Sequence, residues 1–176
     1  MILDQLTYKA LQRLVLLFLV LHNLEEAVTL KIYLPKINAL LDGSVPASLL
    51  ASRPTLTQFY IALAGATIFP LLIVAIATTG QPTRTKDYLV AILQALLLVN
   101  VFAPHVPAAI ALGGYAPGVL TAVLLNLPFS VYFFRRSLRE SRITRKGIII
   151  TMAIALPVLL LSVRLLYALA GWLVSY

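Results

Sequence analysis

Five apolar segments, each long enough to cross a lipid bilayer, constrain this chain more than any other feature of its sequence. Crossing the hydrocarbon core takes about 20 residues of helix, each adding a rise of about 1.5 Å. We place the segments at residues 11–30, 56–79, 88–112, 117–134 and 148–173. The sequence therefore predicts an all-α fold, a polytopic membrane helical bundle that forms one domain over residues 1–176.

The composition agrees with lipid as the main solvent. Hydrophobic residues make up 61% of the chain and charged residues only 11%, and the mean hydropathy is +0.96. A soluble domain would carry about 25% charged residues to keep its surface hydrated. Because the chain has no cysteine, disulfides, thiol catalysis and cysteine-ligated metals are excluded.

The positive charge indicates orientation rather than nucleic-acid binding. The net charge is +8, and six basic residues are crowded between the last two segments: Arg135, Arg136, Arg139, Arg142, Arg145 and Lys146. Such clusters mark cytoplasmic loops. Counted over alternate connections, ten Lys and Arg residues fall on this side and three on the other. We therefore expect the N-terminus inside, the C-terminus outside and no nucleic-acid partner.

The connection between the first two segments contains several helix breakers. Pro35 is expected to help end the first helix, and a short interfacial turn is expected over residues 46–51. Pro117 suits the first turn of the fourth helix, where a missing N–H costs nothing.

Three ionisable residues interrupt the first apolar segment. His22, Glu25 and Glu26 lie in its last third, and a carboxylate in hydrocarbon costs at least ~2.5 kcal/mol. At about 100° per residue, the three side chains share a helix face roughly 100° wide. That face is therefore expected to look into the bundle.

Other helices bring polar groups to the same depth. With alternating helix directions, His105, Thr121 and Arg164 all fall near the level of Glu25, in the outer half of the bilayer. We expect Arg164 to pair with one of the two glutamates, because pairing lowers the cost of burying both charges.

Two chemistries fit the group formed by His22, Glu25, Glu26 and His105. These side chains could bind a divalent metal such as zinc, iron or manganese. Alternatively, they could act without a metal as a general acid and base. In either case Asn100 and Thr121 would orient the substrate, and purely structural polar packing is the competing interpretation.

Three motifs in order resemble the HXXEE family of bacterial integral membrane proteins. They are His22-Asn-Leu-Glu25-Glu26, Asn100-Val-Phe-Ala-Pro-His105 and Tyr115-Ala-Pro117-Gly118-Val-Leu-Thr121. The second departs from the family pattern, because four residues rather than three separate the asparagine from the histidine. The resemblance adds Pro117 and Gly118 to the candidate site and implies a multi-pass protein of the bacterial inner membrane that is suspected to be an enzyme.

Our leading functional hypothesis is a membrane-embedded enzyme with a lipophilic small-molecule substrate reached from the membrane lipid. The chemistry would be metal-assisted hydrolysis or oxidation, or metal-free isomerisation or cyclisation. A small proton- or cation-coupled transporter is the alternative, in which a homodimer could complete the path. The third hypothesis is a structural or assembly subunit.

Overall fold

The computed structural model describes residues 2–44 and 54–175, and all regular structure within them is helical. This confirms the all-α class. The elements, in chain order, are η1 (Ile2–Gln5), α1 (Tyr8–Ser44), α2 (Leu56–Thr78), α3 (Arg84–Asn100), η3 (Val101–His105), α4 (Val106–Ala111), α5 (Val119–Thr121), η4 (Ala122–Asn126), α6 (Leu127–Arg139) and α7 (Arg145–Val174). The turn expected at 46–51 lies outside the described residues.

Within the described residues, three helical segments are long and apolar enough to cross a membrane. They are Leu56–Thr78, Arg84–Ala111 and Arg145–Val174. Two of the five segments expected to span therefore fall outside this set. The first carries charged residues along its apolar part, and the fourth is divided among α5, η4 and α6.

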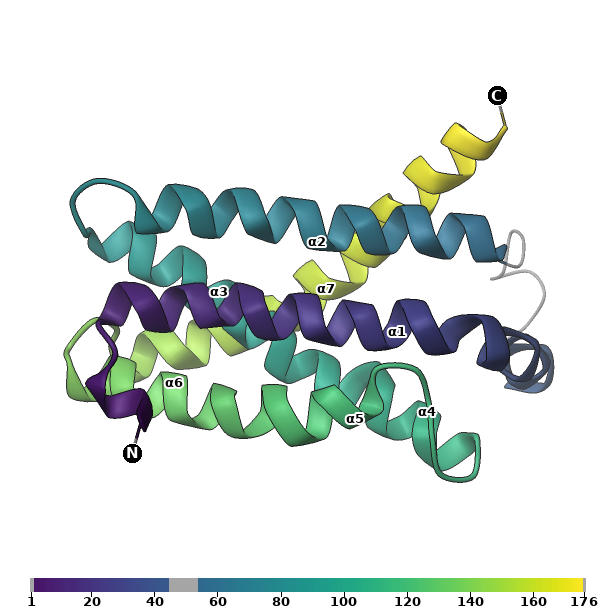
Figure 1. Ribbon diagram of the computed structural model, residues 1–176, viewed down its shortest axis with the longest axis horizontal. Helices are drawn as coiled ribbons and strands as arrows, with labels where there is room; N and C mark the ends of the chain where they lie inside the picture. Colours follow the sequence, from purple (N-terminus) through teal and green to yellow (C-terminus); the bar gives the residue numbers. More distant parts are fainter. Residues whose placement is uncertain (1, 45–53, 176) are drawn as a thin grey trace.

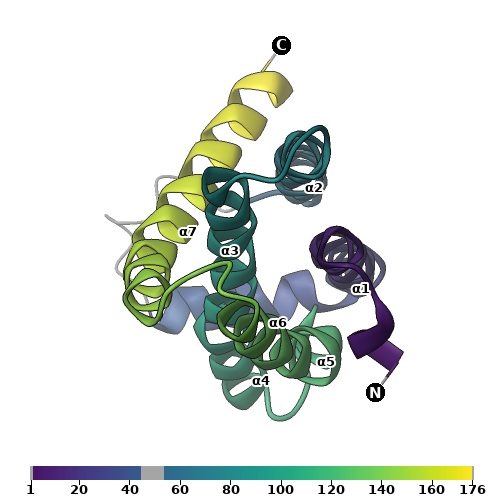
Figure 2. The same ribbon diagram turned by 90° about the vertical axis from the view of Figure 1, so that its left-hand side faces the viewer.

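Helix α3 is central to the bundle and packs against α1, α2, α6 and α7. Helices α1 and α2 run side by side in opposite directions, while α7 crosses α2 and α3 obliquely and its C-terminal end projects beyond them (Figure 1). The end-on view shows α3 between α7 and the stack of α6 and α5 (Figure 2). The apolar core, which includes Leu11, Val90 and Phe133, fills the half of the bundle nearer the N-terminus.

Threonine side chains begin three of the helices. Thr55, Thr83 and Thr144 each accept a hydrogen bond from a backbone N–H in the first turn of α2, α3 and α7. These caps satisfy N–H groups that have no partner within the helix. They also place the starts of α2 and α7 close to the boundaries expected from the sequence.

The expected end of the first helix is wrong. Helix α1 continues through Pro35 to Ser44 instead of stopping near residue 30. Proline removes one backbone hydrogen bond and bends a helix, but this does not oblige the chain to leave the helical conformation.

The expected start of the fourth helix is also wrong. Helix α5 begins at Val119, after Gly118 with φ +80°, so Pro117 lies before the helix and not in its first turn. The helical path then continues to Arg139. Three of the basic residues assigned to the following loop, Arg135, Arg136 and Arg139, therefore lie on α6.

Candidate functional site

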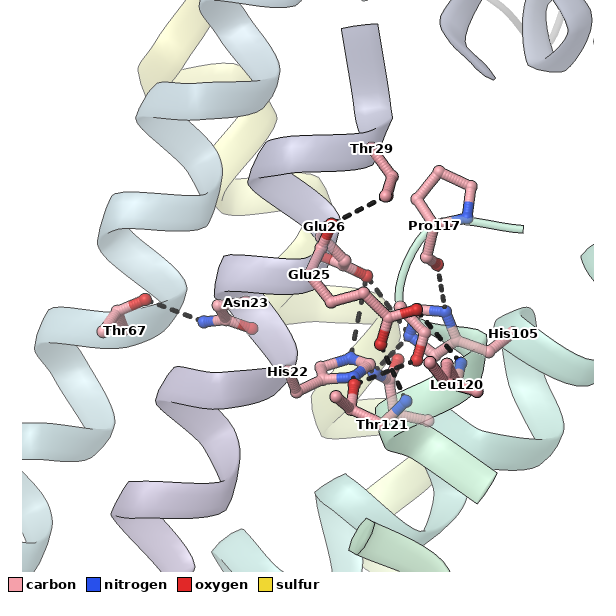
Figure 3. A network of polar contacts seen from close by, with 12 residues as sticks. His22, Asn23, Glu25, Glu26, Thr29, Thr67, His105, Pro117, Leu120 and Thr121 are labelled. Carbon is pink, nitrogen blue, oxygen red and sulfur yellow. Dashed lines mark hydrogen bonds and ion pairs between the residues drawn. The ribbon is translucent and has the colours of Figure 1, made fainter. Parts of the chain in front are cut away.

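Three separate parts of the chain converge on one polar cluster beside the middle of α1 (Figure 3). Helix α1, the junction of α3 with η3, and the segment before and within α5 contribute to it. Its members are His22, Glu25, Glu26, Asn100, His105, Tyr115, Pro117, Gly118, Leu120 and Thr121. Every residue of the three sequence motifs that was predicted to belong to the site is therefore in the cluster.

His105 is held in one tautomer by the backbone. Its Nδ1 lies 2.9 Å from the carbonyl oxygen of Pro117. A carbonyl oxygen only accepts hydrogen bonds, so Nδ1 carries the proton. In the neutral ring, Nε2 then carries a lone pair. His105 Nε2 lies 2.8 Å from Asn100 Nδ2 and 3.2 Å from Glu26 Oε1. Only 4% of the residue is exposed.

His22 is held in the same tautomer as His105, with the proton on Nδ1. Its Nδ1 lies 2.9 Å from Thr121 Oγ1, and that hydroxyl donates to the Gly118 carbonyl at 3.3 Å. The hydroxyl thus accepts from Nδ1–H, which leaves the Nε2 lone pair facing Asn100 Nδ2 at 3.2 Å and Glu26 Oε1 at 3.7 Å. The two imidazole rings meet edge to face with centroids 4.5 Å apart.

Glu26 is the point on which both histidines converge. One carboxylate oxygen faces the Nε2 atoms of His22 and His105, and all three are electron-rich when the rings are neutral and the acid is ionised. Such an arrangement needs a proton or a cation between the groups. The Glu26 side chain is 24% exposed, whereas both imidazoles are almost fully buried. Glu26 is therefore the most exposed of the three converging side chains.

Glu25 has a different role from its neighbour. Its carboxylate accepts hydrogen bonds from the Tyr115 hydroxyl at 2.7 Å, the Leu120 N–H at 3.1 Å and the Thr121 N–H at 2.7 Å. These backbone donors belong to the first turn of α5, so Glu25 caps that helix from α1. The sequence grouped Glu25 with the ligand or acid/base residues, but the structure gives its oxygens to the helix start.

The additional residue between Asn100 and His105 is accommodated by a kink within η3. In a regular α-helix, side chains five positions apart would differ by about 140° in direction. Ala103 leaves helical backbone angles, with φ −151° and ψ 100°, so the α-helical repeat no longer sets the directions of the two side chains. The Asn100 amide consequently reaches Nε2 of both histidines.

Gly118 lies directly against the cluster. A Cβ atom there would be 2.7 Å from His105 Cε1, 2.8 Å from His22 Cε1 and 2.9 Å from Glu26 Cγ. The backbone φ of +80° also favours glycine. The resemblance implied that Gly118 belongs to the site, and the structure explains why no side chain fits.

Arg164 is not brought to the cluster. Its side chain is exposed on α7, and no ion pair joins it to a glutamate in the described part of the chain. The expected pairing assumed that all helix axes are aligned with one another. In the structure α7 crosses the bundle obliquely (Figure 1). Asn23, within the first motif, points the other way and donates to Thr67 Oγ1 on α2 (Figure 3).

Two contributors were missed by the sequence interpretation. Tyr115 was not among the predicted site residues, although its position in the third motif was a usable signal. The Leu120 contribution is a backbone N–H, for which a side-chain pattern gives no signal.

Fold and cluster together define the class: an all-helical protein with bilayer-length apolar helices and a His/Glu cluster that α1 and η3 bring together. The chain belongs to the family described as "Protein of unknown function with HXXEE motif", whose model matches residues 13–133. The letters of that motif correspond to His22, Glu25 and Glu26.

One relative is the "Uncharacterized protein YrkK" of Bacillus subtilis (strain 168). It is 26% identical over 147 residues, which cover 84% of this chain and 87% of that protein. No solved structure gives a significant match to the chain.

Proposed function

We propose that this protein is a membrane-embedded enzyme that acts on a lipophilic substrate at the cluster of His22, Glu26 and His105. The observation that carries the proposal is the convergence of two Nε2 lone pairs and one carboxylate oxygen on a single point. The Asn100 amide supplies one shared donor to the two Nε2 atoms, but polar packing alone would not also turn a carboxylate oxygen toward both lone pairs. The ring N–H groups are used on the far sides of the rings, and the Nε2 atoms and the Glu26 oxygen face one another.

The apolar surroundings support a substrate that comes from lipid. Residues next to the cluster along the chain present large exposed apolar side chains, among them Leu24, Val28, Phe102, Ile110 and Leu120. An apolar substrate would partition into such surroundings, and Glu26 would be the first polar group that it meets.

We further infer that α1 and the path from Val119 to Arg139 also cross the membrane, which gives five spans. The excess of Lys and Arg on one side supports an N-terminus inside and a C-terminus outside, in the inner membrane of a bacterium. In this orientation the cluster lies in the outer half of the bilayer.

Each residue has a defined part in the proposed chemistry. Glu26 would transfer a proton to or from the substrate, or share in holding a metal, and the two imidazoles would hold it in position. Thr121 acts through His22, and Asn100 contacts both histidines at the point where they meet. Glu25 and Gly118 fix the segment that carries Thr121.

Lipid analysis of bacterial cells tests the proposed function. Cells expressing the wild-type protein should accumulate or lose a lipophilic compound relative to cells with an empty vector. The Glu26→Gln variant should abolish that change, whereas Glu140→Gln, which alters a carboxylate at the other end of the bundle, should preserve it. Identical lipid profiles for wild type and Glu26→Gln at matched expression would overturn the enzyme proposal.

A proton-coupled transporter is the second candidate, and a different observation favours it. Asn126 and Gln94 are fully buried, and three of their side-chain polar atoms have no hydrogen-bond partner within the described residues. Such atoms could hold water and conduct protons through the core. Proton-driven uptake by liposomes that is lost in Glu26→Gln, with no change in lipid profiles, would favour this alternative.

A further inference from the structure

We propose that the cluster is a mononuclear site for a divalent transition metal, bound by His22 Nε2, His105 Nε2 and the Glu26 carboxylate, with the Asn100 amide oxygen as fourth donor. The inference deepens the proposed function, because it names the cofactor of the same site. The experiment that tests it nevertheless measures metal binding and not turnover.

The spacing of the donors fits one ion. The two Nε2 atoms and the Glu26 oxygen all lie within 4.8 Å of one another. Donors that surround zinc tetrahedrally at about 2.1 Å are about 3.4 Å apart. The separations from Glu26 Oε1, 3.2 Å to His105 Nε2 and 3.7 Å to His22 Nε2, lie on either side of that value. Small side-chain movements are enough to close the coordination shell.

The outer contacts of both imidazoles are those expected of metal ligands. A ligating histidine usually donates its second ring N–H to a carbonyl or another polar acceptor, which fixes the tautomer and the ring plane. His105 makes this contact with the Pro117 carbonyl, and His22 makes it with the Thr121 hydroxyl. Both Nε2 lone pairs are thereby aimed at the same point before any ion arrives.

The Asn100 amide contacts both histidines and can interact with them both without a metal and with one bound. With its Nδ2 facing them, it donates to both Nε2 atoms at 2.8 and 3.2 Å and holds the lone pairs in the absence of a cation. Rotation of the amide by 180° presents Oδ1 instead, and an amide oxygen is a competent ligand for a divalent cation.

Charge balance also favours a dication. A metal with two positive charges would be offset by the Glu26 carboxylate and by the neighbouring Glu25 carboxylate, which is fixed at the start of α5. The cluster then needs no basic side chain, in agreement with the exposed position of Arg164. Two imidazoles with oxygen donors suit zinc, iron(II) or manganese(II) rather than magnesium or calcium.

The test is metal loading of the full-length purified protein. After chelator treatment, the protein in detergent is reloaded with Zn²⁺ or Co²⁺ and then desalted, and bound metal is measured by mass spectrometry. The wild type should retain about one ion per chain, and Co²⁺ should give the visible absorption of a site with mixed nitrogen and oxygen donors. His105→Ala, His22→Ala and Glu26→Gln should each weaken binding by at least about tenfold.

Matched controls separate the metal site from general damage. Asn23→Ala changes the residue adjacent to His22 that points to α2, and this variant should bind metal like the wild type. Near-zero metal in the folded wild type after Zn²⁺ loading would overturn the metal proposal, as would equal binding by wild type and Glu26→Gln. If lipid conversion persisted in such metal-free protein, the proposed function would stand and Glu26 would act as a proton carrier.

Discussion

At the scale of single residues, two adjacent glutamates contact different parts of the structure. Glu26 turns toward the two imidazoles, and Glu25 turns toward the start of α5. Side chains one position apart on a helix differ by about 100° in direction, so they meet different neighbours. The sequence predicted that both acids face the bundle, but it could not assign their tasks, because the donors that hold Glu25 are backbone N–H groups of another segment.

Glu25→Gln should therefore destabilise the protein without removing the metal. The neutral amide offers one acceptor oxygen where the carboxylate offers two, and it loses the favourable interaction with the helix N-terminus, which costs about 1–2 kcal/mol. Thermal unfolding in detergent should show a lower midpoint, while metal stoichiometry stays near that of the wild type. Tyr115→Phe, which removes one of the three hydrogen bonds, should give a smaller decrease. Loss of metal from folded Glu25→Gln protein would contradict a purely structural role for Glu25.

Gly118→Ala should disrupt the site because of both its backbone angle and the close contacts. Gly113 offers a matched control, since its φ is also +80° but no atom lies within 4 Å of the position of an added Cβ. Both alanine variants carry about 1–2 kcal/mol of left-handed backbone strain. Only Gly118→Ala should also reduce bound metal, as measured by mass spectrometry. Equal metal content in the two variants would contradict the close packing of Gly118 against the imidazoles.

At the scale of elements, the kink within η3 explains how Asn100 and His105 meet, which regular helix geometry does not predict. η3 follows α3 and η4 follows α5, so two of the segments that supply site residues are irregular next to the cluster, whereas α1 continues past it without interruption. Hydrophobic periodicity locates long helices such as α2 and α7, but a single inserted residue leaves it almost unchanged. The same limit applies to Pro35, where the sequence predicted a break and the helix continues.

Asn126, at the end of η4, carries a prediction about the core. It is 1% exposed, and neither its Nδ2 nor its Oδ1 has a partner within the described residues. Each unsatisfied buried group costs about 1–3 kcal/mol, so Asn126→Leu should raise the midpoint of thermal unfolding. Gln94→Leu should raise it less, because Gln94 Nε2 already donates to Ser130 Oγ at 2.6 Å. A lower midpoint for Asn126→Leu would indicate that these atoms bind ordered water and would strengthen the transport alternative.

At the scale of the whole molecule, the two ends of the bundle differ. At one end Arg136 on α6 donates to the backbone carbonyls of Leu3 and Leu6 and pairs with Glu140, which fastens η1 to the bundle. The polar cluster lies toward the other end of α6, beside α5 (Figure 1). If the positive charge marks the cytoplasm, the fastened end is inside and the cluster is nearer the outside.

Cysteine labelling can test this orientation directly, because the chain has no native cysteine. Single substitutions at Gln5 and Gln81 are expected inside, and those at Asp42 and Ser175 outside; all four residues are exposed. In intact cells a membrane-impermeant maleimide should therefore label Asp42→Cys and Ser175→Cys, and it should label Gln5→Cys and Gln81→Cys only after permeabilisation. Five spans with the N-terminus inside require this pattern. The reversed pattern would invert the topology, and equal labelling of Gln5→Cys and Asp42→Cys in intact cells would show that α1 does not cross the membrane.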